Sequence, residues 1–202
     1  MYVPKNYTFN DRGEMITFMK RYSFATIITN IDHKPVATQL PFVVEATGDR
    51  LFLSSHFAIA NKQAGYIEQQ LSLIIFSEPH AYISPVHYDK KESVPTWDYI
   101  SIHAYGAARI VMEEERKMKL LEQMIGFYEP RYRQQWEELP NKFKYGMLKG
   151  IVAFEIEVQE LQGQKKLSQN KTVAERRRIV EQLQQSEQGV ERDIAAYIKE
   201  LD

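Results

Sequence analysis

A run of short extended segments between residues 24 and 56 constrains the fold more than any other feature of this sequence. Its three stretches read FATIITNI, PVATQLPFVVEA and RLFLSSH. Stretches so rich in β-branched and aromatic residues favour strands, and the tetrapeptides DHKP and TGDR between them favour turns. The run therefore predicts a β-meander, whereas a parallel doubly wound sheet would need strands and helices in regular alternation.

Strand character returns further along the chain, at 71–78, 81–88, 99–107 and 150–161. In the third of these segments, residues that suit a core alternate with polar or half-polar ones at a period of two, which gives a strand one face toward the core. The residues on that face are Ile100, Ile102, Ala104 and Gly106. We expect the segment at 150–161 to form the last long strand.

Helices are predicted before, among and after the strands. The first follows a candidate N-cap at Asn10 or Asp11, and its apolar residues recur at helical spacing as far as Tyr22. Further helices are expected at 58–70, 112–128, 131–140, 172–183 and 189–201. Strands with turn-length links, one helix inserted among them and a helical tail together predict an α+β fold, mainly β: an antiparallel barrel with helical insertions and a helical C-terminal tail.

Composition limits the binding partners and the cellular compartment that we expect for this protein. Lysine and arginine number 26 against 27 acidic residues, so the net charge of -1 gives no general attraction to nucleic acid or to anionic membranes. The absence of cysteine excludes disulfides, thiolate nucleophiles and cysteine metal sites. The N-terminus lacks the apolar run of a signal peptide, and no segment approaches the ~20 apolar residues of a membrane span. We expect a soluble, cytoplasmic protein with no membrane partner.

The motifs of common enzymes are missing from the sequence. It contains no GxGxxG, P-loop, HExxH or GxSxG pattern and no zinc spacing. His80 and His87 suit metal ligands on nearby turns, but histidines in a chain without cysteine more often form hydrogen bonds. We therefore predict no metal site and name no catalytic residue.

Four segments collect hydroxyl, amide and small side chains where we expect strands to end. TQLPF at 38–42 places a proline in a strand, which implies a sheet edge or a ligand. SSHFAIAN at 54–61 leads from a strand into a helix whose free amides suit a phosphate, although an ordinary helix cap explains it equally well. VPTWDY at 94–99 suits a planar ligand, an oligomer interface or a core. KKLSQNK at 165–171 suits a ligand contact or a solvated loop.

Taken in order, several segments together resemble a known family. They are MYVPKNY, QLPF, SHFAIAN, PHAYISPVHY, VPTWDYISIHAYG and KKLSQN, spread from residue 1 to about residue 171. They are similar to the PaiB family of FMN-binding negative transcriptional regulators, in which VPTW(D/N)Y and K.KLSQN are distinctive. The resemblance implies a split β-barrel of the pyridoxamine-phosphate oxidase and flavin-reductase type, whose homodimer binds FMN in clefts shared between subunits.

The resemblance also implies which residues hold FMN. Along the flavin ring and ribityl chain we expect Thr38, Gln39, Leu40 and Pro41. At the phosphate end we expect Ser54, Ser55, His56 and Asn61. Closing the cleft from the partner chain we expect Trp97, Lys166, Ser168, Gln169 and Asn170. Ile59 stands where the family usually carries an arginine, so a bidentate phosphate partner is missing and we expect weaker FMN binding.

Two classes of function follow from the resemblance. The family name implies repression of genes for degradative enzymes and sporulation, whereas the same barrel also serves flavin oxidoreductases that act on small molecules. No evident catalytic acid, base or nucleophile is present, so we rank the regulator first and leave enzymatic activity open. We divide the chain into an FMN-binding split-barrel domain at 1–171 and a C-terminal helical extension at 172–202, packed on the barrel.

Direct contact with DNA is expected to be weak. The nearest candidate for a helix-turn-helix is 185–192, but the helix that follows it is too acidic to enter a groove well. Basic side chains lie just before it, at Lys171, Arg176, Arg177 and Arg178. They would neutralise phosphates in a salt-dependent manner, although a solvated helix face explains the three arginines as well.

Overall fold

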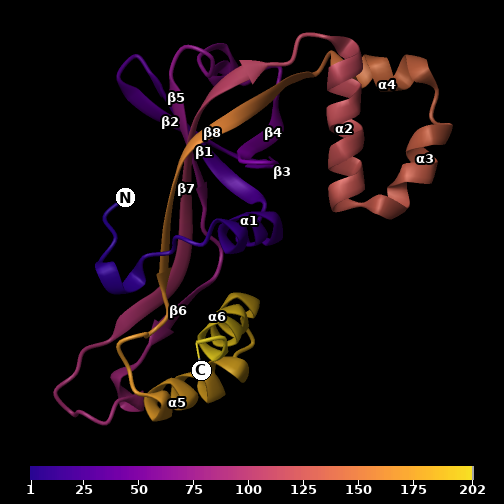
Figure 1. Ribbon diagram of the computed structural model, residues 1–202. Coiled ribbons are helices and arrows are strands. Elements are labelled where there is room, and N and C mark those ends of the chain that lie inside the picture. The colour runs from indigo at the N-terminus through magenta and orange to yellow at the C-terminus, as the bar shows by residue number, and fades with distance from the viewer. Residues whose placement is uncertain (202) are drawn as a thin grey trace. The chain divides into compact units, whose positions relative to one another are not determined.

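The computed structural model describes residues 1–201, and its strands form one sheet in the order β2-β1-β5-β7-β8-β4-β3, with β6 paired to β7 (Figure 1). The strands are β1 (Phe24–Ile31), β2 (Lys34–Pro41), β3 (Val43–Thr47), β4 (Arg50–Ala58), β5 (Leu71–Phe76), β6 (His80–Ile83), β7 (Thr96–Ile110) and β8 (Ile151–Lys166). The pairs β1–β2, β1–β5, β3–β4, β4–β8 and β6–β7 are antiparallel, which confirms the predicted sheet type.

The helices follow most of the predicted segments. They are α1 (Arg12–Arg21), α2 (Glu114–Tyr128), α3 (Arg133–Glu138), α4 (Asn141–Leu148), α5 (Val173–Gln184) and α6 (Gly189–Lys199), with short 3₁₀ helices η1 (Lys5–Tyr7), η2 (Lys62–Gly65), η3 (Pro85–His87) and η4 (Pro130–Tyr132). Asp11 caps α1, because its Oδ1 accepts a hydrogen bond from the N–H of Glu14 (2.8 Å). Through residue 201, no helix has both the length and the apolar character needed to span a membrane.

The chain divides into two compact units. The first unit comprises residues 1–15, 77–102 and 162–202, and the second comprises 16–76 and 103–161. β7 and β8 each contribute one part to either unit. The division predicted at residue 171 stays a prediction.

In the second unit, the meander has the predicted strands with one correction. The stretch at 35–46 is not one strand, because β2 ends at Pro41 and β3 starts at Val43. Phe42 between them is fully buried and donates its N–H to the carbonyl of Ser23 (2.9 Å). β2 pairs with β1 whereas β3 pairs with β4, so the two halves lie at opposite ends of the strand order. Pro41 therefore ends an edge strand, as its missing N–H predicts.

The helix predicted at 58–70 is wrong. β4 continues to Ala58, and only the four-residue η2 follows. The reason is local competition by side chains: Asn61 Oδ1 accepts a hydrogen bond from the N–H of Gln63 (2.9 Å), which closes a turn in place of a helical bond. Gln63 is then buried against neighbouring strands, and a helix on the surface would not place it there.

The helical insertion α2–α4 belongs to the second unit (Figure 1). The buried face of α2, with Leu120 and Met124, packs on Val43 of β3, on Ala153 of β8 and on Val111, which follows β7. Because these two α2 residues lie four apart, they share one face of the helix. This packing fixes the insertion to β3 and β8 and to the end of β7.

In the first unit, the predicted helical tail is confirmed as α5 and α6. A capping box starts α5: the Oγ1 of Thr172 accepts from the N–H of Glu175 (3.2 Å), and the Glu175 carboxylate accepts from the N–H of Thr172 (2.9 Å). Ile179 and Ile194 are buried, one from each helix. The sequence motif that ends β8 thus leads directly into a well-defined helix.

Candidate functional site

A polar cluster joins β2 to η2 in the second unit. Asn61 Nδ2 donates to Thr38 Oγ1 (3.0 Å), which in turn donates to Gln63 Oε1 (2.6 Å). The amide nitrogen of Gln63 donates to Thr29 Oγ1 (3.1 Å) and to the carbonyl of Ile27 (3.2 Å). The structure thus brings together Thr38, predicted along the flavin ring and ribityl chain, and Asn61, predicted at the phosphate end. Gln63, which holds them, was missed because a buried glutamine gives no periodic signal.

Other predicted residues of the second unit lie beside this cluster in sequence but differ in exposure. Ser55 Oγ donates to the carbonyl of Pro41 (2.7 Å), and Ser55 is fully buried. Leu40 is buried, whereas Gln39 is exposed. Pro41 and Ser55 are therefore in contact, and Gln39 is the member of the β2 group most open to a ligand.

The phosphate cradle predicted at the start of a helix is wrong in its geometry. Ser54 lies inside β4, opposite Val43 on β3 and Glu155 on β8, so this part of the strand is paired on both sides. The backbone amides there belong to a paired strand and are not the free amides of a helix N-terminus. Ile59 is exposed and brings no charge. Phosphate binding by Ser54, Ser55, His56 and Asn61 stays a prediction that now rests on side chains.

His56 has surroundings of its own. Its ring lines an apolar cavity with residues of α2–α4, and its Nδ1 is buried without a hydrogen-bond partner among residues 1–201. Burial lowers the pKa of His56, which favours the neutral imidazole. In a strand, His56 and Ser55 face opposite sides, so these two predicted residues do not act on one ligand atom.

The first unit contains a polar cavity of about 210 Å³ where VPTWDY meets the end of β8. The side chains that give it its chemistry are Tyr7, Tyr88, Asp98, Lys166, Ser168, Asn170 and Lys171. Three of these, Lys166, Ser168 and Asn170, were predicted as cofactor contacts. The two distinctive family motifs therefore form one cavity.

Asp98 is the buried centre of this cavity. Its side chain is fully buried, and Ser168 donates from Oγ to Asp98 Oδ2 (2.6 Å) with Ser168 in the left-handed region at φ 58°. The other oxygen, Oδ1, and the hydroxyl of Tyr88 are buried without partners in the described part of the chain. Burial raises the pKa of Asp98 to about 6, against the opposing effects of the Ser168 hydrogen bond and of Lys166. Unpaired buried groups of this kind are costly and point to a bound polar group.

Two lysines bring positive charge to the same cavity. Lys166 Nζ donates to Thr96 Oγ1 and to the carbonyl of Trp97, and burial lowers its pKa. Lys171 Nζ lies 3.5 Å from the centroid of the Tyr88 ring. The prediction assigned Lys171 to DNA, but in the structure this ammonium is a cation–π partner inside the cavity.

The remaining predicted residues of the first unit have different surroundings. Gln169 shapes the turn, because its Oε1 accepts from the N–H of Leu167 (2.7 Å) and its amide donates to the carbonyl of Lys165. Trp97 is exposed, with its ring centroid 5.9 Å from that of His80 and 5.8 Å from that of Tyr82. Trp97 is available to a ligand or a second subunit, whereas the side chain of Gln169 is already engaged.

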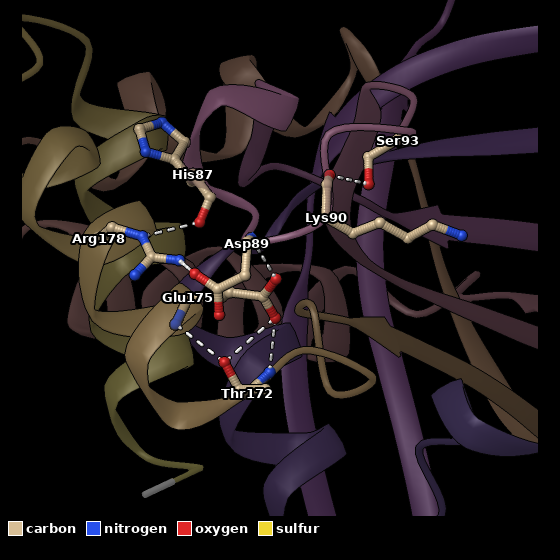
Figure 2. A network of polar contacts seen from close by, with 7 residues as sticks. All are labelled: His87, Asp89, Lys90, Ser93, Thr172, Glu175 and Arg178. Atoms are coloured by element: carbon tan, nitrogen blue, oxygen red, sulfur yellow. Dashed lines mark hydrogen bonds and ion pairs between the residues drawn. The ribbon is translucent and has the colours of Figure 1, made fainter.

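The arginine run of α5 is partly engaged in internal contacts (Figure 2). Arg178 donates to the carbonyl of His87 (2.8 Å) and pairs with Asp89 (2.6 Å). Glu175 in the same network accepts from the N–H of Asp89 (2.9 Å), and its pKa is lowered chiefly by the hydrogen bond from the N–H of Thr172. Arg177 is exposed. Of these two arginines, only Arg177 presents its charge away from this network.

Comparison with known proteins decides the family. Residues 1–160 match the domain family described as "Putative FMN-binding domain". The chain belongs to the PaiB-like FMN-binding family. A relative in Bacillus subtilis (strain 168), "Protease synthase and sporulation protein PAI 2", is 37% identical over 191 residues, which cover 93% of this chain and 91% of the relative. The family and its cofactor, FMN, are thus as the motifs predicted.

Solved structures show the fold of this PaiB-like chain. The flavocytochrome Anf3 of Azotobacter vinelandii is similar with a TM-score of 0.62 and 15% identity, covering 82% of this chain and 72% of that one. The FAD and heme binding protein of Mycobacterium smegmatis gives a TM-score of 0.62 and 13% identity, covering 79% and 73%. These neighbours confirm the predicted split-barrel fold.

The residues present fit FMN in chemistry. Asp98 Oδ1 and the Tyr88 hydroxyl have no hydrogen-bond partner within residues 1–201, and Lys166 and Lys171 supply positive charge for an anionic group. At about 210 Å³ the cavity is smaller than the ~300–1,000 Å³ of sites for drug-sized ligands, so it suits one part of the cofactor. Asp98 and Tyr88 were missed by sequence reasoning, although both lie in the quoted motifs.

Proposed function

We propose that this PaiB-like chain is a cytoplasmic, FMN-binding negative regulator of genes for degradative enzymes and sporulation, and that it acts as a homodimer. The observation that carries the proposal is the 37% identity to PAI 2 across 93% of the chain. So long a match extends beyond the FMN-binding motifs into α5. The name of PAI 2 links that relative to protease synthesis and sporulation.

The binding residues have separate tasks in this proposal. Thr38 and Asn61, held by Gln63, present polar groups at the edge of β2. Lys166 and Lys171 attract an anionic group, and Asp98 holds or releases a proton near neutral pH. FMN, when bound, supplies reversible redox chemistry. The regulator would then respond to the redox state of its cofactor.

A deletion strain of the native host tests the regulatory role. Deletion should raise secreted protease activity and alter spore counts, and the wild-type gene should restore both. Complementation with Asn61→Ala, after its FMN content has been measured in the purified protein, should restore less. Unchanged protease secretion and sporulation after deletion would contradict the regulatory proposal without touching FMN binding.

A second candidate function is a flavin-dependent oxidoreductase. It is favoured by Asp98, a fully buried carboxyl with a pKa of about 6 in the cavity, because such a group can transfer a proton at physiological pH. Stopped-flow reduction of the FMN-loaded protein by NADH and NADPH tests it. Fast, saturable reduction that slows at least ~100-fold in Asp98→Asn supports the enzyme, because proton transfer by a positioned side chain contributes about that much. No reduction above that of free FMN would exclude nicotinamide-dependent turnover.

A further inference from the structure

A second cavity, of about 460 Å³, lies in the second unit between the helical insertion and the sheet. Its volume is in the ~300–1,000 Å³ range of small-molecule sites. The lining is mostly apolar and aromatic, and the residues that matter here are His56, Met124, Tyr132, Trp136, Phe143 and Met147. Phe143 and Met147 are half exposed, so the cavity opens to solvent beside α4.

The walls of this cavity are held by specific contacts. The ammonium of Lys144 lies 5.5 Å from the Trp136 ring centroid and donates to the carbonyl of Glu137 (3.1 Å). The hydroxyl of Tyr128 lies 2.8 Å from Ser23 Oγ, which ties the end of α2 to the sheet. A chamber braced in this way is preformed and does not depend on a ligand to assemble it.

The charge of the lining selects the ligand. Among the described residues that line the cavity there is no lysine or arginine, and Glu129 adds a carboxylate. The lining therefore offers no cation to compensate an anion such as the phosphate of FMN, whereas two lysines line the cavity around Asp98. The His56 ring contributes to this lining, and its Nδ1 is a buried ring nitrogen without a partner in residues 1–201. Burial keeps this imidazole neutral, so it suits a hydrogen bond with an uncharged group.

We propose that this cavity binds an uncharged, planar aromatic molecule that carries one hydrogen-bonding group opposite His56. The proposal assigns His56 to this ligand instead of to the FMN phosphate, for which it was predicted, and it does not rest on the proposed regulatory role. Bound there, such a molecule would contact both the insertion and β4, and it is suited to act as an effector. A second copy of the chain seated over Phe143 and Met147 is the competing occupant.

Calorimetry with two matched probes tests the proposal on FMN-saturated protein. 2-Naphthol has the required ring and a hydroxyl that can donate or accept, and it should bind saturably with one molecule per chain. Naphthalene-2-sulfonate has the same ring with a negative charge, and it should bind at least roughly tenfold more weakly because nothing in the lining compensates the charge. His56→Phe should weaken 2-naphthol by up to about tenfold, the range of one hydrogen bond.

Two methionine variants locate the site. Met147→Lys places a charge at the cavity mouth and should weaken 2-naphthol at least roughly tenfold, whereas Met147→Leu should bind normally. Met112→Lys is the matched control, because Met112 is also exposed but does not line the cavity. The proposal is overturned by no saturable binding, by equal loss in Met112→Lys, or, in flavin-free protein loaded with 2-naphthol, by displacement of 2-naphthol when FMN is added. A second copy of the chain fills the cavity if the wild type is a dimer that does not bind 2-naphthol and Met147→Lys is a monomer. That result would also overturn the proposal.

Discussion

Ser168 and Asp98, 70 residues apart in the sequence, share a buried hydrogen bond of 2.6 Å that joins the two most distinctive motifs of the chain. Ser168 adopts a left-handed backbone conformation, at φ 58°, that is unusual for any residue other than glycine. Strain of this kind persists only when the surroundings impose it. The turn after β8 is therefore built to bring a hydroxyl to Asp98.

Stability should depend on pH through Asp98. Because burial raises its folded-state pKa to about 6 from an ordinary 3.8, the folded protein binds this proton more tightly than the unfolded chain. The neutral carboxyl is favourable at low pH, and that contribution is lost as pH rises from about 4 through 6. Asp98→Asn should therefore be more stable than wild type at pH 7.5, by on the order of 2–3 kcal/mol.

Urea unfolding of both proteins at pH 4.5 and pH 7.5 checks this expectation. The gap between Asp98→Asn and wild type should shrink at the lower pH, where the wild-type carboxyl is protonated. Comparing the two proteins at each pH cancels the contributions of other titrating groups. A gap that stays constant would show that Asp98 is ionised normally.

Gly106 allows β7 to approach β8 closely in the second unit, because a larger residue would not fit there. A Cβ there would lie 2.4 Å from the carbonyl oxygen of Glu157 and 2.5 Å from Cγ2 of Ile156. Gly106→Ala should cost about 2–3 kcal/mol of unfolding free energy, the range of an overpacked core. Gly126→Ala is the matched control, because a Cβ there meets nothing within 4 Å and alanine favours helix α2 by up to ~1 kcal/mol. Chemical denaturation of both variants should thus give shifts of opposite sign, and a neutral Gly106→Ala would refute the close approach.

Substitutions of the arginines of α5 should distinguish a loss of stability from a loss of DNA binding. Arg178→Ala removes a hydrogen bond to His87 and a pair with Asp89 that is largely solvent-exposed, so it should lower stability by roughly 1 kcal/mol. Arg177→Ala should change stability by less than ~0.5 kcal/mol, as exposed substitutions usually do.

Electrophoretic mobility shifts with promoter and scrambled duplexes, run over a salt series, measure DNA binding by the same proteins. We expect weak binding to both duplexes, lost as salt rises, and weakened further in Arg177→Ala. Tight, promoter-specific binding that survives substitution of Arg176, Arg177 and Arg178 together would place the DNA surface elsewhere. Light scattering of the same samples should report twice the chain mass.

The parts of the fold that follow from local pattern were predictable. Alternation in β7 placed Ile102 and Ala104 in the core, and both are fully buried. Pro41 marked an edge strand because its missing N–H cannot serve a ladder. The helix predicted at 58–70 failed because Asn61 and Gln63 make long-range and turn hydrogen bonds that propensity does not contain.

The candidate site was predictable in composition but not in geometry. The motifs named Lys166 and Ser168, yet the importance of Asp98 depends on burial that only the distant Ser168 turn creates. The prediction grouped the residues of β2 and β4 around one ligand. In the structure, His56 and Ser55 lie on opposite faces of one strand. Spacing within a motif does not carry such information, because each face is chosen by tertiary packing.

Calorimetric titration of FMN into flavin-free protein is the most direct test of the flavin site. The wild type should saturate with one FMN per chain. Asn61→Ala should bind roughly tenfold more weakly, about the value of one or two polar contacts, while the exposed control Gln69→Ala should match the wild type. Absence of saturable binding by wild type up to tens of micromolar, on the scale of ordinary ligand affinities, would contradict the account.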